Sequence, residues 1–360
     1  MQRFLVHAIL TFVFLGILLT ACGPQSSTIT SAPAVPTVNL ASPTSASAAT
    51  ATVPSTAAPP PPSPTVAASP TSAPSPTAAP TTSASTYPLS FQDDHKRSIT
   101  VVGQPKRIVS LAPSCTEILF AVGAGQQVVA VDQFSNYPAT AASKPKVGGL
   151  QANLEQILAL NPDLVCAAGI TPDSLIQSLG QAKVTVVVLD AQTIPQVLGD
   201  ITLAGRVVGH PAIGNKVAAD VQSRISAAEE KVAGAARPRV YDELDATDPS
   251  KPYTVGPGSF VDGLITAAGG QNVFSQAQSP YPQVNLEEVL HLDPQIILLS
   301  DAQYGVTAAS VGKRVGWAGI TAVKNHAVYP IDADLVSRPG PRIADAVEAM
   351  AKLFHPNRFK

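Results

Sequence analysis

The stretch NLEQILALNPDLV at residues 153–165 is repeated as NLEEVLHLDPQII at residues 285–297. In each copy the leading Asn can cap a helix, because Gln156 or Glu288 follows three residues later at the spacing of a capping box. The Pro in each copy ends that helix, and the apolar residues after it indicate a buried strand. Each copy is therefore predicted to be a short helix that leads into a strand of a parallel sheet.

Two such units far apart in one chain predict an α/β fold with two related, Rossmann-like lobes and a ligand cleft between them. Glu155 and Glu287 occupy the second helical position of the two units. Either they complement the helix dipole, worth about 0.3–1 kcal/mol each, or they are exposed acidic contacts, one on each lobe. The spacing alone leaves both interpretations open.

The composition excludes some classes of function. Of the 360 residues 13% are charged, the formal net charge is −2 and the pI is near 6.3. No basic run is present, so a nucleic-acid partner is not expected. The length allows two domains.

The first 21 residues are typical of a secretion signal. Arg3 precedes an apolar run from Ala8 to Leu19, and small residues lead to Cys22. The segment is similar to a bacterial lipobox, which implies cleavage before Cys22 and lipid attachment to its sulfur. The alternative is an ordinary signal peptide with an incidental Cys. The lipobox interpretation predicts a protein anchored by lipid alone to the outer face of the cytoplasmic membrane.

Residues 22–86 are predicted to be a disordered tether. From Gly23 to Thr86 the chain has no charged or aromatic residue and is rich in Pro, Ser, Thr and Ala. Such a segment cannot bury enough apolar surface to offset the entropy lost on ordering. Its composition also permits O-glycosylation.

The remainder is divided into an N-terminal α/β lobe at 87–193, a helical connection at 194–236 and a C-terminal α/β lobe at 237–360. An opening hairpin is expected near residues 88–102, with caps for later helices at Ser114, Thr171 and Ser259. A long loop at 132–151 is expected to be functional. Strands are predicted at 107–111, 128–131, 164–167, 184–189, 239–244, 295–300 and 328–331.

The connection between the lobes is predicted to contain a long helix from Ile213 to Val232. Val217, Val221, Ile225 and Ala228 recur there at helical spacing. A helical connection is stiff, so small lobe movements are expected.

Neither a catalytic nor a metal-binding pattern is present in the sequence. The six His residues are scattered singly, and no HExxH, GxSxG or P-loop pattern occurs. Cys115 and Cys166 could form a disulfide or remain two buried thiols. We therefore expect no enzyme, no cofactor and no bound metal.

A set of motifs resembles one known family. The motifs that carry this similarity are RIVSLAPS at 107–114 with TEIL at 116–119, YP at 137–138, VGG at 147–149, the first repeat, YPQV at 281–284 and RPGPRI at 338–343. With them, the sequence is similar to ABC-importer substrate-binding proteins of the helical-backbone class (class III). The cobalamin (vitamin B12) and iron-siderophore receptors belong to it, and the cobalamin-binding members are the nearest. The resemblance spans about residues 98–354 and implies two lobes joined by a long helix.

The resemblance also implies roles for single residues. Tyr137 and Tyr281 match aromatic contacts to a corrinoid, while Asp334 and Arg338 match polar contacts to its amide rim. Lobe-surface packing is the alternative for the two tyrosines, and a cap or an ion pair is the alternative role for Arg342. Leu150 departs from the pattern, because some cobalamin receptors have an aromatic residue there.

The family's partners are implied in the same way. Glu155 and Glu287 resemble the paired glutamates that dock on the two permease subunits of an ABC importer with its ATPase. The expected protein is a monomeric receptor for a corrinoid, with a ferric siderophore or haem as the alternative ligand. A surface α/β enzyme is the remaining alternative, against which the missing catalytic pattern argues.

Overall fold

The computed structural model describes residues 85–149 and 151–360, which belong to one compact unit. The predicted signal peptide, Cys22 and nearly all of the predicted tether lie outside these residues, as does Leu150. Within the described part, no helix has both the length and the apolar character needed to cross a membrane.

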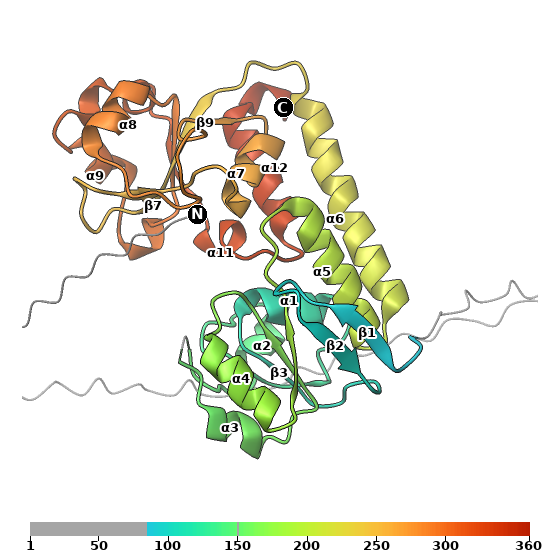
Figure 1. The fold of residues 1–360 in the computed structure, drawn as a ribbon. Helices are drawn as coiled ribbons and strands as arrows, with labels where there is room; N and C mark the ends of the chain where they lie inside the picture. Colours follow the sequence, from blue (N-terminus) through green and yellow to red (C-terminus); the bar gives the residue numbers. More distant parts are fainter. Residues whose placement is uncertain (1–84, 150) are drawn as a thin grey trace, which may run out of the picture. The chain divides into compact units, whose positions relative to one another are not determined.

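A hairpin and a four-stranded parallel sheet form the N-terminal lobe (Figure 1). The hairpin pairs β1 (Leu89–Gln92) with β2 (Ser98–Val101) in antiparallel register, as predicted. The sheet has the order β4-β3-β5-β6 and consists of β3 (Ile108–Ser110), β4 (Val128–Val131), β5 (Leu164–Ala167) and β6 (Thr185–Val188). The helices of this lobe are α1 (Pro113–Ala121), α2 (Ala139–Ala142), α3 (Leu154–Ala159) and α4 (Asp173–Gln181).

The C-terminal lobe has a second, mostly parallel sheet. The strands of this sheet run in the order β11-β10-β7-β8, and β9 also pairs with β7. Among the described strands of this sheet, only β8 is antiparallel to its neighbour. They are β7 (Arg239–Asp245), β8 (Tyr253–Thr254), β9 (Gln271–Asn272), β10 (Ile296–Leu299) and β11 (Val328–Pro330). Its helices are α7 (Phe260–Ala267), α8 (Leu286–Leu292), α9 (Ala308–Gly312), α10 (Thr321–Lys324), α11 (Ala333–Val336) and α12 (Ile343–Phe354), with 3₁₀ turns at Ala302–Tyr304, Trp317–Gly319 and Pro356–Arg358.

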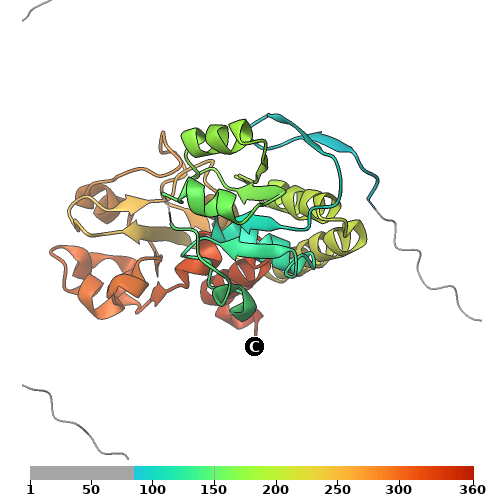
Figure 2. The ribbon, with the colours of Figure 1, turned by 90° about the horizontal axis from the view of Figure 1, so that it is seen from below.

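Helices cover both faces of each sheet (Figure 2). Side chains alternate along a strand, so Val109 of β3 packs toward α3 and α4 while Ile108 packs toward α1 and α5. In the C-terminal lobe Tyr241 of β7 faces α8 and Trp317, and Val240 faces α7 and α12. The buried apolar runs in the sequence reflect strands that are covered on both sides.

The two lobes are joined by α5 (Ile194–Val207) and α6 (Pro211–Val232), which pack against each other. Figure 1 shows α6 running beside both lobes, and it also packs on α12. As predicted, Val221, Ile225 and Ala228 are buried. One continuous apolar cluster extends from Ile108 in the first sheet through α6 to Phe354 at the end of α12. This cluster is therefore a hydrophobic core that both lobes share.

The repeated stretch forms the same structure twice. The Asn153 side chain accepts a hydrogen bond from Gln156 N, and Asn285 makes a complete capping box with Glu288. In each lobe an arginine donates two hydrogen bonds to the carboxyl end of the repeat helix. Arg107, just before β3, donates to Leu160 O at 2.9 and 2.7 Å, and Arg239, the first residue of β7, donates to Asp293 O at 3.2 and 2.7 Å. A cation at a helix carboxyl end also complements the helix dipole.

Two of the predicted caps are wrong. Helix α1 starts at Pro113, with Ala112 as its cap residue, because Pro needs no backbone donor at the first helical position. Ser114 is therefore inside the helix, and Glu117 is free to make contacts elsewhere. In α4 the cap residue is Pro172, while the Thr171 hydroxyl accepts a hydrogen bond from Ala168 N. The cap predicted at Ser259 is confirmed.

Candidate functional site

A cleft of about 840 Å³ lies between residues of the two lobes. This volume is near the upper end of the range of about 300–1,000 Å³ for small-molecule sites. Segments that follow the carboxyl ends of parallel strands supply most of its lining: 112–114 after β3, 133–136 after β4, 168–170 after β5, 189–192 after β6, Leu244 in β7, 303–304 after β10 and 333–339 after β11. Ligands of open α/β sheets bind at this edge.

The walls of the cleft expose large apolar and aromatic side chains. Phe134 and Ile170 come from the N-terminal lobe and Tyr281 and Tyr304 from the C-terminal lobe, with 48%, 64%, 48% and 81% of their surfaces exposed. Exposed aromatic residues facing a shared cavity are typical of a site for a flat or macrocyclic ligand, because such residues bury large area at low entropic cost.

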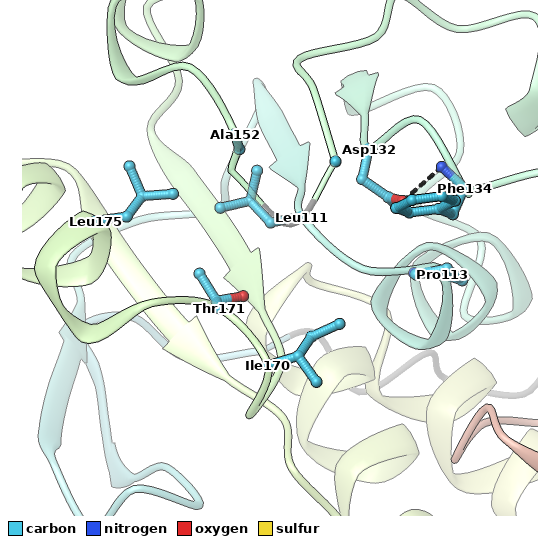
Figure 3. A pocket seen from close by; sticks show the side chains of 9 residues that line it. Leu111, Pro113, Asp132, Phe134, Ala152, Ile170, Thr171 and Leu175 are labelled. Carbon is cyan, nitrogen blue, oxygen red and sulfur yellow. Dashed lines mark hydrogen bonds between the residues drawn. The ribbon is translucent and has the colours of Figure 1, made fainter. Parts of the chain in front are cut away.

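A small recess of about 20 Å³ in the N-terminal lobe shares Pro113, Phe134 and Ile170 with the cleft (Figure 3). The Asp132 carboxylate accepts a hydrogen bond of 2.7 Å from Phe134 N, which holds the backbone beside this recess. The recess has room for one water molecule or one small group.

Ionic contacts join the two lobes at one end of the cleft. The Glu117 carboxylate of α1 accepts hydrogen bonds from Nε and Nη2 of Arg342, at 2.8 and 2.6 Å, and one from Nη1 of Arg338 at 3.1 Å. The exposed fractions of these side chains are 2% for Glu117, 9% for Arg338 and 15% for Arg342. Two arginines that share one buried carboxylate fix the distance between α1 and the segment before α12.

The same network includes Asp334. Its carboxylate is 2.6 Å from Arg338 and accepts a 2.9 Å hydrogen bond from Asn136 in the opposite lobe. Arg338 also donates to Asn136 Oδ1 at 2.7 Å. The charge of Arg338 is therefore compensated within the protein, by Glu117 on one side and Asp334 on the other.

Three of the four residues predicted to contact the ligand lie in the cleft, namely Tyr281, Asp334 and Arg338. Tyr137 is not among the lining residues, although the adjacent Asn136 is. The Arg342 guanidinium lies 4.4 Å from the centre of the Tyr137 ring, a cation–π contact. Arg342 thus makes an ion pair with the other lobe as well as this stacking contact.

On the N-terminal wall Asp190 lines the cleft beside a second carboxyl group. Burial, followed by the charge of Asp94 and a hydrogen bond with it, raises the pKa of Asp200 to about 8. Burial also raises the pKa of Asp190. The Asp190 carboxylate accepts a 3.0 Å hydrogen bond from Gln192 and lies 3.8 Å from the His95 ring.

The C-terminal lobe holds acidic residues beneath its wall. Glu243 is buried and receives two hydrogen bonds from Arg314, at 2.5 and 2.8 Å. Asp242 accepts one from Ser300 at 2.7 Å, and its second oxygen has no hydrogen-bond partner among residues 85–149 and 151–360. Burial raises the pKa of Asp242 to about 7 and that of Asp301 to about 6. These groups lie behind the wall and do not line the cleft.

Among the described residues, no three His, Cys, Asp or Glu side chains converge in a way that could hold a metal ion. Cys115 and Cys166 are both free and buried, so the structure shows two buried thiols rather than a disulfide between them. The Cys115 thiol donates to Ala167 O at 3.2 Å, and burial raises its pKa. The buried thiols are part of the core of the N-terminal lobe.

Glu155 and Glu287 are exposed in the first turn of α3 and α8. The capping contacts are made by their neighbours Asn153, Asn285 and Glu288, and neither carboxylate takes part in the hydrogen bonds or ion pairs of the described residues. The two glutamates therefore occupy equivalent, accessible places on the two lobes.

The sequence interpretation missed several residues that line the cleft. Asp190, Ile170 and Tyr304 each follow a predicted strand within a few positions. The rule that ligands bind at the carboxyl edge of parallel strands could have identified them. Phe134 and Asn136 fall in the loop at 132–151 that was predicted to be functional.

Comparisons with known proteins agree with this arrangement. The family model described as periplasmic binding protein matches residues 108–335. The ABC transporter substrate-binding lipoprotein YvrC of Bacillus subtilis is 33% identical over 281 residues, covering 76% of this chain and 88% of that protein. Among solved structures, the vitamin B12 binding protein BtuF of Vibrio cholerae is 31% identical with a TM-score of 0.63, covering 71% of this chain and 99% of that one. The haem-binding protein RhuT of Roseiflexus sp. RS-1 is 27% identical with a TM-score of 0.64, covering 71% and 100%.

Proposed function

Because the chain belongs to the periplasmic binding protein family, the substrate-binding proteins of ABC importers, we propose that its interlobe cleft captures a corrinoid for import. The cleft is large, its walls expose Phe134, Ile170, Tyr281 and Tyr304, and few charged groups line it. A corrin ring has broad apolar faces and a rim of neutral amides, which such walls can cover.

The charge of the cleft is the observation that carries this choice. Among the described lining residues the charged side chains are Asp190, Asp334 and Arg338, and Arg338 is already compensated by Glu117 and Asp334. A ferric catecholate siderophore carries several negative charges and needs uncompensated cations to bind. A neutral, amide-rich ligand suits this cleft better.

Haem is the second candidate, for a specific reason. Tyr281 and Tyr304 present exposed phenol groups to the cleft, and a phenolate can ligate haem iron. The haem-binding RhuT of Roseiflexus is also similar to this chain in fold. The propionates of haem, however, would meet Asp190 and Asp334 rather than a free arginine.

The ligand can be identified by its colour. The purified full chain is incubated with cyanocobalamin, haemin and a ferric tris-catecholate together, desalted, and its visible spectrum recorded. We expect a retained corrinoid band at a ratio of about one per chain. Retention of haemin or of the ferric complex with no corrinoid would contradict the corrinoid assignment and leave the receptor role intact.

We also propose how the receptor is attached and how it delivers its ligand. Lipid attachment at Cys22 and the tether at 22–86 would hold the folded lobes outside the cytoplasmic membrane. Glu155 and Glu287 would then dock on the two permease subunits of the importer and couple it to its ATPase. Their exposure, their equivalent positions and their lack of intramolecular partners among the described residues support this role.

A further inference from the structure

Asp190 differs from the other charged residues of the cleft in having no arginine or lysine partner among the described residues. Asp334 and Arg338 compensate each other, whereas the nearest basic group to Asp190 is the His95 ring at 3.8 Å. The side chain is 35% exposed, and it lines the cavity together with Gln192. Its carboxylate can therefore still accept hydrogen bonds from a ligand.

The local backbone holds this carboxylate at the carboxyl ends of β5 and β6. Gly169 also lines the cleft, and a Cβ at residue 169 would overlap the Asp190 carboxyl group. Asp94 accepts a 2.6 Å hydrogen bond from Asp190 N, which fixes the backbone. The other carboxyl groups near Asp190 are Asp94 and the buried Asp200.

Asp190 shares the cleft with Tyr281 of the opposite lobe. Burial, and to a lesser extent the charge of Asp190, raises the pKa of the Tyr281 phenol. Both residues line the same cavity. A ligand that fills this cavity would thus meet both Tyr281 and Asp190.

We infer that Asp190 is a specificity-determining residue of the cleft, which accepts hydrogen bonds from N–H groups at the edge of the ligand and disfavours carboxylates there. This inference rests on the proposed function in taking the cleft as the ligand site. The ligands that Asp190 would select carry primary amides or a positive charge at the edge that faces it. An unpaired carboxylate repels a ligand anion, and bonds from N–H donors to a carboxylate are stronger than bonds to a neutral acceptor.

The test uses two corrinoids, cyanocobalamin with its amide rim and cobyrinic acid, which has carboxylates in place of the amides and lacks the nucleotide loop, and it includes haemin; each ligand is compared between the unmodified protein and the variant. Dissociation constants are measured for the full chain and for Asp190→Asn. We expect the variant to bind cyanocobalamin about tenfold more weakly and to bind cobyrinic acid and haemin several-fold more tightly. Asp220→Asn, which removes the same charge from the exposed face of α6, is the control and should change none of these values.

A second variant, Gly169→Ala, keeps the charge but displaces the carboxylate, and it should also weaken cyanocobalamin binding. Unchanged affinities in Asp190→Asn, or changes of the same sign for amide and carboxylate ligands, would overturn the inference. If the unmodified protein retains haemin and no corrinoid, the corrinoid proposal fails by itself. The role of Asp190 is then decided by haemin alone, which must bind more tightly to Asp190→Asn.

Discussion

The two lobes share one structural unit and differ in the charges that surround it. In each lobe an Asn-capped helix of the repeat leads into a parallel strand, and an arginine, Arg107 or Arg239, donates to the carbonyl at the end of that helix. Three residues after each arginine the lobes diverge, with Ser110 in the first and Asp242 in the second. Ser110 makes neutral hydrogen bonds with Thr116 and Ala112, whereas Asp242 is a buried carboxyl group.

The two walls of the cleft also differ in how their charged side chains are paired. On the C-terminal wall Asp334 and Arg338 compensate each other, while on the N-terminal wall Asp190 has no such partner in the part of the chain that the structure describes. The outer surfaces with Glu155 and Glu287 remain equivalent. The surfaces that carry Glu155 and Glu287 thus follow the symmetry of the repeat, whereas the walls of the cleft do not. This difference agrees with the proposed function, in which the cleft holds a ligand without two-fold symmetry and the two glutamates dock on a pair of permease subunits.

The largest effect is expected where the charges of the two lobes meet. Glu117→Ala leaves Arg338 and Arg342 buried without their shared carboxylate, which should lower the free energy of unfolding by about 3–5 kcal/mol. Urea unfolding measures the loss. Glu348→Ala is the control, because Glu348 pairs with Arg224 at the surface between α6 and α12 and should cost less than about 1 kcal/mol. Equal losses in the two variants would show that the buried network adds nothing to stability.

A smaller effect concerns pH and the buried acid of the second lobe. The pKa of Asp242 is about 7 in the folded protein and near 4 when unfolded, so the folded state binds the extra proton between these values. Stability should therefore fall as pH rises from about 4 to 7, by on the order of 2 kcal/mol between pH 5 and 7. Asp200, whose pKa is about 8, acts in the same direction.

Asp242→Asn keeps the acceptor for the Ser300 hydroxyl and removes the titration. The variant should gain stability at pH 8 and lose part of the pH dependence, as measured by unfolding at pH 5 and pH 8. The same change at the exposed Asp220 should leave the pH profile unaltered. A variant with the unmodified protein's pH profile would contradict the titration of Asp242.

The sequence predicted the repeated units well because their signals are local. The caps at Asn153 and Asn285, the strands after them and the helix at 213–232 depend on residues within a few positions of one another. The role of Glu117 was missed for the opposite reason, since its partners Arg338 and Arg342 are 221 and 225 residues away. No local pattern predicts such a pairing.

The candidate site was predicted only in part for the same physical reason. Tyr281, Asp334 and Arg338 were identified from motifs and line the cleft, but the compensation of Arg338 by Glu117 depends on how the lobes meet. Asp190 carries no motif, and its place is set by the end of β6. Strand order and lobe contacts are needed to see which strand ends face the same cavity.

The most direct measurement is made on the surfaces that follow the symmetry of the repeat. Glu155→Ala combined with Glu287→Ala is reconstituted with the permease and its ATPase, and ATP hydrolysis is compared with that given by the unmodified receptor. Both carboxylates are exposed and outside the capping contacts, so unfolding and ligand affinity should stay nearly constant, while loss of two interface charges should abolish stimulation. The adjacent pair Gln156→Ala with Glu288→Ala serves as control and should stimulate normally despite a weaker cap. Full stimulation by the Glu155 and Glu287 double variant would contradict the proposal that the two repeat helices dock on the importer.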